Sequence, residues 1–238
     1  VTYFYCNEML QLIVEPARLK IAKIFVRAKI IHQEKLLKKL RISSKKKFFS
    51  EDIEKAHDLD SLRGMEGFVA RQYFDMWKRM GVLKNEQFRF SGRRKRPPLD
   101  EVNALLGFCY TLLHSEVITQ LEIAGLDPYF GFLHDHRFGH AALASDFVEI
   151  YRAVIDHFVI KAINRKEFDK DDFSCDKGGR FRLSSKGFGK FFPKWAEYIR
   201  YEERQGEYSL VALIERDVRR FVRYLMEDEE KFEVFIWK

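Results

Sequence analysis

Residues 64–77, GMEGFVARQYFDMW, carry apolar side chains at the spacing of an α-helix, and they indicate the fold class of the whole chain. The apolar set in and around this stretch consists of Leu59, Leu62, Met65, Phe68, Val69, Tyr73, Phe74 and Trp77. Apolar residues that recur every three or four positions predict an amphipathic helix, here over residues 58–80 and ending near Gly81. Of the two carboxylates in this stretch, Glu66 and Asp75, Glu66 is the candidate site residue. Because a packed core has no need of an acid, Glu66 is either a functional residue or one half of a structural ion pair with Arg71 or another arginine.

The same periodicity continues on both sides of this helix. It predicts a helix that starts near Pro16 and runs through Leu40, one between Pro97-Pro98 and the break AGLDPYFG at residues 124–131, and three more over residues 143–163, 184–201 and 207–228. The stretch GGRFRLS at residues 178–184 is compatible with a hairpin or a brief extended piece. We therefore expect an all-α fold, with residues 16–238 as one α-helical domain and residues 1–15 as a linker or the end of a preceding segment.

Composition narrows the class of protein. The chain has 238 residues, of which 46% are hydrophobic, so it can bury a sizeable core. Its formal net charge of +7 favours a polyanionic partner, although many ordinary proteins carry such a charge. The three cysteines are widely spaced and form no CxxC pair, which indicates a reducing cytoplasm. No apolar run is long enough for a membrane span, so we expect no membrane association.

Positive charge is concentrated in two places. Residues 17–47 hold twelve lysines and arginines against the single acid Glu34, which fits either a solvated helix face or a DNA-binding surface. The second cluster, Arg93-Arg94-Lys95-Arg96, lies in a loop stiffened by Pro97-Pro98. Because four adjacent cations in one loop cannot all find acidic partners, we expect most of them to contact phosphates.

Two further stretches place polar residues where a core would not. GFLHDHRFGH (131–140) includes His134, and LASDFVEIYR (143–152) places Asp146 and Glu149 on one face of a predicted helix. Taken singly, the histidine is compatible with a satisfied loop residue and the two acids with a solvated helix face. Together with Glu66 they form a candidate site for one divalent ion. Carboxylates suit Mg²⁺ or Mn²⁺, and a nitrogen ligand favours Mn²⁺ without excluding Mg²⁺.

The order of the motifs resembles that of the CRISPR-associated integrase Cas1, the endonuclease that inserts new spacers into CRISPR arrays. The motifs that carry the resemblance are GMEGFVARQYF (64–74), FSGRRKRPPLDEVNALLGFCYTLL (90–113), AGLDPYFGFLH (124–134) and LASDFVEIYR (143–152). The resemblance implies a helical catalytic domain that in the family follows a small N-terminal β domain, and we expect this sequence to hold only the helical domain. It further implies one divalent ion, Mg²⁺ or Mn²⁺, on Glu66, His134 and Glu149, with Asp146 as an accessory acid. DNA would be held by Arg71, Arg93, Arg94, Lys95 and Arg96.

The activity implied by the resemblance is transesterification, in which a 3′-hydroxyl of spacer DNA is joined to a phosphodiester of the CRISPR repeat. The resemblance also implies a homodimer and a small partner protein, Cas2. Since His134 must be neutral to bind an ion, activity should fall below about pH 6.5, the ordinary pKa of histidine. Two alternatives stay open. One is a helical nucleic-acid-binding or scaffolding module without chemistry, and the other is a transposon-encoded integrase of the same family.

Overall fold

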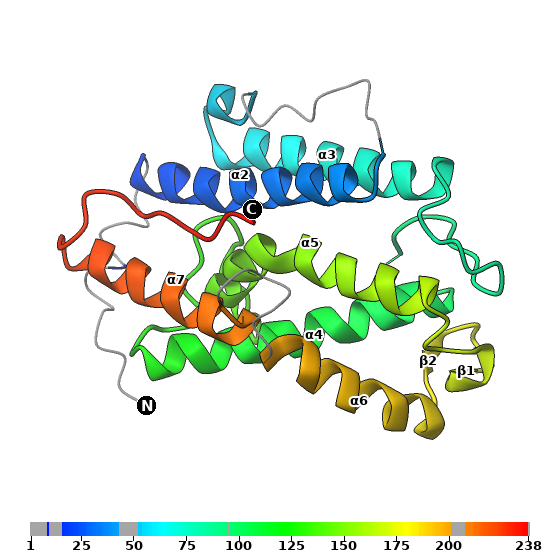
Figure 1. Ribbon diagram of the computed structural model, residues 1–238. Coiled ribbons are helices and arrows are strands. Elements are labelled where there is room, and N and C mark those ends of the chain that lie inside the picture. The colour runs from blue at the N-terminus through cyan, green and yellow to red at the C-terminus, as the bar shows by residue number, and fades with distance from the viewer. Residues whose placement is uncertain (1–8, 10–15, 43–51, 95, 201–207, 238) are drawn as a thin grey trace.

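Six α-helices and one short hairpin make up the part of the chain that the computed structural model describes, residues 9, 16–42, 52–94, 96–200 and 208–237 (Figure 1). The helices are α2 (Ala17–Lys39), α3 (Leu59–Arg79), α4 (Glu101–Ile123), α5 (Ala142–Asn164), α6 (Ser185–Arg200) and α7 (Leu210–Leu225). Two short 3-10 turns, η1 (Asp52–Lys55) and η2 (Lys170–Asp172), precede α3 and the hairpin. All six predicted helices are therefore confirmed, with bounds within a few residues of those expected.

Local signals account for these bounds. Asp58 caps α3 by accepting a hydrogen bond of 2.7 Å from the backbone N–H of Ser61, and Asp100 caps α4 in the same way through Asn103. Ser209 caps α7. Beyond the last turn of α3, Gly81 has a φ of +58°, a conformation that glycine adopts without strain and that ends the helix.

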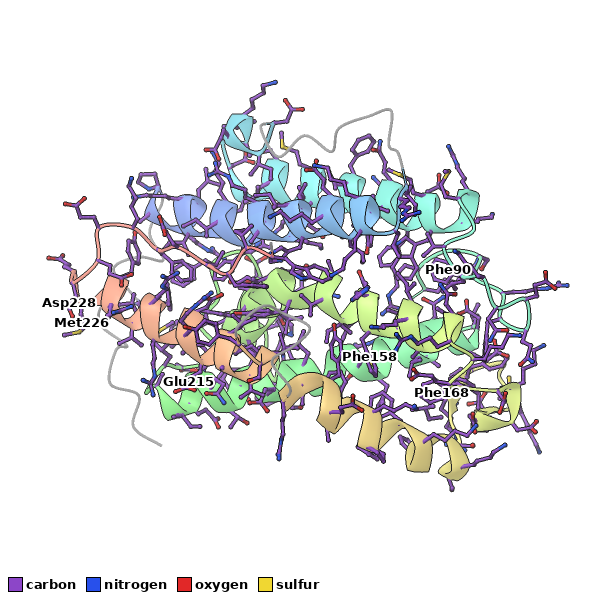
Figure 2. All side chains as sticks on the ribbon, in the orientation of Figure 1. Phe90, Phe158, Phe168, Glu215, Met226 and Asp228 are labelled. Carbon is purple, nitrogen blue, oxygen red and sulfur yellow. The ribbon has the colours of Figure 1, made fainter. Side chains whose placement is uncertain are left out.

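Helix α5 is the centre of the core. It lies between α2 on one side and α4 on the other (Figure 1), and only four of its side chains are not buried, namely Arg152, His157, Lys161 and Asn164. Phe158 lies among the side chains between α5 and α6 (Figure 2), where it packs against Trp195 with ring centroids 5.7 Å apart. The two acids near the start of α5, Asp146 and Glu149, are therefore buried among the surrounding elements.

A two-stranded antiparallel hairpin, β1 (Phe173–Cys175) and β2 (Phe181–Leu183), is the only sheet among the described residues. The register pairs Phe173 with Leu183 and Cys175 with Phe181. The hairpin settles the choice left open for residues 178–184. The fold is thus mostly helical rather than strictly all-α.

The segment after α7 runs back across α2 (Figure 1). Its aromatic side chains Phe232, Phe235 and Trp237 are buried. The backbone N–H of Trp237 donates to Nε2 of His32 on α2 at 2.8 Å, and the N–H of Phe235 donates to Asp217 at 2.7 Å. We call residues 232–237 the C-terminal strap. Of the helices described here, none has the length and apolar character needed to cross a membrane.

Candidate active site

Glu66 and Glu149 converge on one cation, the ammonium of Lys29. Glu66 comes from α3, Glu149 from α5 and Lys29 from α2, so three helices supply the cluster. The Lys29 ammonium donates to Oε1 of Glu66 and lies 2.6 Å from Oε2 of Glu149. Because both carboxylates contact the same nitrogen, their oxygens are only a few ångströms apart. The expected neighbourhood of these two acids is therefore present.

Lys29 itself corrects one interpretation of the sequence. It is one of the twelve cations of residues 17–47 that fitted a solvated face, yet it is 6% exposed. Burial lowers its pKa, but the charges of Glu149 and Glu66 outweigh burial and leave the pKa above its ordinary value. Lys29 is therefore a buried ammonium held by two acids, and no part of a surface for DNA.

Asp146 shapes the loop that carries His134. Its carboxylate is fully buried and accepts hydrogen bonds from the backbone N–H groups of Phe132, Leu133 and His134, at 2.6, 3.0 and 3.0 Å. It also lies 2.6 Å from Nδ1 of the His134 ring. Both oxygens of Asp146 are thus occupied, and the contacts favour a role in positioning His134. Direct contact of Asp146 with an ion stays a prediction.

The imidazole of His134 has one nitrogen to spare. Since Nδ1 faces Asp146, Nε2 is the nitrogen left for a ligand. Burial lowers the pKa of His134, but the hydrogen bond and charge of Asp146 raise it more, so that the net shift is upward. A proton therefore competes for this ring at a higher pH than the ordinary histidine pKa implies.

One cavity joins the three predicted ligands. It has a volume of about 610 Å³ and is lined by Glu66, His134 and Glu149 together with Arg63, Arg96, Leu133, Asp135, Arg137, Phe138 and His140. We call it the catalytic cavity. The isolated-residue alternatives do not hold for the acids of α5, because Asp146 and Glu149 are 0% and 3% exposed and so do not form a solvated face. Glu66 does have an ion-pair partner, and the partner is Lys29 rather than an arginine.

Glu66, His134 and Glu149 are of the residue types that bind a divalent cation, but their side chains are not grouped around one point. As placed, no group of three or more His, Cys, Asp or Glu side chains within the described ranges is close enough to hold a metal ion. The ammonium of Lys29 stands between the two carboxylates instead. Oε2 of Glu149 is buried and has no aligned hydrogen-bond donor in the described part of the chain, although Lys29 Nζ is near. Two carboxylates that share one positive charge, with an imidazole on the same cavity, are the ligand types that Mg²⁺ and Mn²⁺ take.

A second buried network supports Glu149. Arg152, one helical turn further along α5, donates to Oε1 of Glu149 at 2.8 Å, and its guanidinium lies 4.7 Å from the ring centroid of Tyr110. Burial opposes ionisation of Glu149, but the charges of Arg152 and Lys29 hold its pKa below the ordinary value. The acid is therefore ionised and ready to bind a cation at neutral pH.

Asp156 is a further buried acid of α5 close to this network, and the sequence analysis did not predict it as a site residue. Its carboxylate accepts from the hydroxyls of Tyr73, at 2.9 Å, and Tyr110. Burial raises the pKa of Asp156 to about 6 in spite of these hydrogen bonds. Its position one turn after Arg152, within the mostly apolar stretch VIDHFVI (154–160), is the signal that could have found it.

The predicted DNA-binding residues differ in their surroundings. Arg93 is half-buried, donates to Oδ1 of Asn103 at 2.9 Å and lies 5.4 Å from the ring centroid of Tyr110, so it is not a free cation. Arg94, Arg96 and Arg71 are exposed, and Arg96 lines the catalytic cavity. Lys95 lies outside the described residues, as do Lys45, Lys46 and Lys47 of the first basic segment.

Much of the first basic segment has partners within the chain. Arg18 pairs with Asp135 at 3.0 Å, Lys23 donates to the backbone oxygen of Glu54, and Lys35 donates to that of Trp237. This arrangement makes a continuous DNA-binding surface along α2 less favourable. Contact of Arg71, Arg94, Lys95 and Arg96 with DNA stays a prediction.

Comparison with known proteins shows which family has this sequence and fold. The family model described as CRISPR associated protein Cas1 matches residues 7–197. The CRISPR-associated endonuclease Cas1 of Leptospira interrogans serogroup Icterohaemorrhagiae serovar Lai is 32% identical to this chain. The alignment is 248 residues long and covers 94% of this chain and 96% of that protein.

Solved structures agree as well. A casposase bound to integration product superposes with a TM-score of 0.87 at 25% identity, covering 96% of this chain and 70% of that one. A chain of a Cas6-RT-Cas1–Cas2 complex superposes with a TM-score of 0.82 at 26% identity, covering 98% of this chain and 27% of that one. The match of the family model over most of the sequence and the identity to a curated relative of nearly equal length lead to one conclusion: the chain belongs to the CRISPR-associated Cas1 family.

Proposed function

We propose that this chain is a divalent-metal-dependent DNA integrase and endonuclease that joins 3′-hydroxyl ends to phosphodiesters by transesterification. The observation that carries the proposal is the convergence of Glu66 and Glu149 on one positive charge at a cavity that His134 also lines. A protein that only binds DNA does not need two acids and an imidazole at one cavity, whereas a divalent cation that takes the place of Lys29 would use all three as ligands.

The side chains at the catalytic cavity have separate roles that fit phosphoryl transfer. Glu66, Glu149 and Nε2 of His134 would hold Mg²⁺ or Mn²⁺, and such an ion polarises the phosphate and stabilises the charge on the departing 3′ oxygen. Asp146 fixes the orientation of the His134 ring. Arg96, which is exposed and lines the catalytic cavity, would supply positive charge to the phosphate backbone.

The relatives support two candidate biological settings. An adaptation role, in which spacer DNA is inserted into a CRISPR repeat, is our first proposal, with a homodimer and Cas2 as partners in the cytoplasm. The Cas6-RT-Cas1–Cas2 complex supports the Cas2 partner. The casposase favours a second candidate, integration of a transposon end, because it was captured with an integration product.

The proposal is tested with three variants and one control. Glu66→Gln, His134→Ala and Glu149→Gln should each lower strand joining in Mn²⁺ by at least about a hundredfold, since each removes a ligand from a site that stabilises transition-state charge. DNA binding should persist. Glu122→Gln, an exposed acid on α4, is the matched control and should join DNA like the parent. Joining at the parental rate by any of the three would remove that residue from the site, and DNA binding without joining by the parent would favour the non-catalytic module.

A further inference from the structure

A second cavity adjoins the catalytic cavity and has no part in the proposed chemistry. It has a volume of about 640 Å³ and opens where α2, α3, α4 and α5 meet, and Glu66 lines both cavities. Its lining also includes Gln33, Phe68, Arg71, Phe74, Arg93 and Tyr110. We call this cavity the side pocket. Its volume is within the range of pockets that bind small organic groups.

The side pocket holds polar atoms that have no partner. Gln33 is 1% exposed, and its Oε1 has no hydrogen-bond partner among the described residues. The same is true, within that part of the chain, of Nε of Arg93 on another wall. An unsatisfied buried polar atom costs free energy, so native structures rarely keep one without a reason. One free acceptor and one free donor at a single pocket match the edge of a planar group that both donates and accepts.

Aromatic surface is available in the same place. Phe68 is 53% exposed although it belongs to the apolar stripe of α3, and it projects from the helix two residues after Glu66. Phe74 lines the pocket as well and packs against Phe90, which lies in the segment that follows α3 (Figure 2), with ring centroids 6.1 Å apart. A half-exposed phenylalanine beside a pocket is a surface on which another ring can stack.

The charges of the side pocket suit an anionic ligand. Each acid of its lining already has a partner: Glu66 contacts Lys29, Asp75 lies 2.8 Å from Arg79, and Asp156 accepts from two tyrosine hydroxyls. Arg71, by contrast, is exposed at the mouth of the pocket. A ring bound inside would therefore leave an attached phosphate near a cation.

We propose that the side pocket takes one unstacked nucleobase of the DNA bound at the catalytic cavity. The base stacks on Phe68, its edge bonds to Gln33 and Arg93, and its phosphate lies near Arg71. This inference rests on the proposed function, since it requires DNA at the adjoining cavity. It adds a site that would position the strand next to the reacting phosphodiester and make binding depend on the presence of a base at one position.

The test is an abasic scan in the presence of EDTA, so that no strand joining occurs. The probe is a branched DNA duplex with one abasic nucleotide moved in turn through every position near the branch. For the unmodified protein, one position should lose roughly 5- to 100-fold in affinity, the range expected when a base–aromatic stack is removed. Phe68→Ala should weaken binding of the intact probe by a similar factor and abolish the difference between intact and abasic probes at that position.

Two further variants make the result specific. Gln33→Met keeps the size of the side chain and removes the unpartnered oxygen, so its melting temperature should be equal or higher while its discrimination against the abasic probe falls several-fold. Phe192→Ala is the matched control, because Phe192 is 50% exposed on α6 and does not line the side pocket; it should discriminate like the parent.

The outcomes separate the two proposals. A parent protein that binds every abasic probe as tightly as the intact one, or a Phe68→Ala variant that still discriminates, would overturn the nucleobase pocket even if strand joining in Mn²⁺ is normal. Failure of the parent to bind the branched duplex in Mn²⁺ as well as in EDTA would instead overturn the proposed function.

Discussion

At the scale of single residues, the ammonium of Lys29 is the most informative group of the site. It is a monovalent cation fixed between two carboxylates that are proposed to hold a divalent one, so a metal ion and this side chain compete for the same two acids. The competition has two consequences of opposite sign. We expect Lys29 to stabilise the protein without metal and to weaken binding of the proposed ion.

Lys29→Met separates these effects, because methionine has a similar shape and no charge. Without metal, the variant leaves Glu149 buried beside Glu66 with one cation fewer, and its free energy of unfolding should fall by about 3 kcal/mol, the range for a broken buried ion pair. Addition of Mn²⁺ should raise its melting temperature by more than it raises that of the parent. Thermal unfolding with and without Mn²⁺ measures both. An unchanged melting temperature in EDTA would show that Lys29 does not hold the acids together.

The sequence was sufficient for some residues of the site and not for others. Glu66 and Glu149 could be identified because an acid in an apolar helical stripe contradicts simple burial. Lys29 obeys the same logic, since it follows Ala28 and lies one turn after Phe25 on the buried face of α2. The number of lysines and arginines in residues 17–47 conceals it, because only its position on the helix face distinguishes it from its basic neighbours. The positioning role of Asp146 depends on three backbone N–H groups of a loop, and no side-chain pattern encodes those.

At the scale of elements, the helices were predictable and the strands were not. Asp58, Asp100 and Ser209 cap three helices, and Gly81 terminates one, so both the periodicity and its end points can be seen in the sequence. The strands have three residues each, too few for a period of two to be distinguished from chance. The C-terminal strap has no regular structure, and it is defined by its contacts with α2, α5 and α7.

The arginines of the basic loop before α4 differ in burial, so we expect their substitutions to have different effects. Because Arg93 bonds Asn103 and lies over Tyr110, Arg93→Ser should lower the melting temperature. Arg94 and Arg96 are exposed, and the double variant Arg94→Ser/Arg96→Ser should instead weaken DNA binding and flatten the log–log salt dependence by roughly 1 to 2 units, if each contacts one phosphate.

The measurement for this loop is DNA affinity as a function of salt concentration, with melting temperature as the second readout. Arg219→Ser/Lys231→Ser, which removes two exposed charges from α7 and the segment after it, controls for net charge. A salt slope that does not differ between the two double variants would show that the loop does not meet the DNA backbone.

At the scale of the whole molecule, His32 links the chain's first described helix to the C-terminal strap. Its Nε2 accepts from the N–H of Trp237, and its Nδ1 faces the backbone oxygen of Ile150, so both nitrogens are occupied in the neutral ring. Burial lowers the pKa of His32 to about 4. The unfolded chain, with an ordinary histidine pKa near 6.5, therefore binds this proton more readily than the folded protein does.

The sign of the pH effect follows from that difference. The stability that neutral His32 contributes is complete above about pH 6.5 and is lost as the pH falls toward 4, by up to about 3 kcal/mol. Asp156, whose pKa is raised to about 6, acts in the opposite sense, since its contribution is lost as the pH rises through 6. Because these two groups change the stability in opposite directions, the effect of His32 must be measured as the difference between the parent and a variant that lacks this histidine. The difference in unfolding free energy between the parent and His32→Gln, measured in denaturant, should shrink between pH 7 and pH 4. A constant difference would mean that His32 does not resist protonation.

The C-terminal strap also has a consequence for the order of events during synthesis. Phe25 on α2 has its ring 5.8 Å from that of Phe232, and Lys39 lies over the ring of Trp237, so α2 is completed by residues translated some two hundred positions later. While the ribosome synthesises α3 to α7, the face of α2 that contacts residues 232–237 in the folded protein is not yet covered by them. A nascent chain arrested before residue 232 should therefore engage chaperones or aggregate more than one released after residue 237.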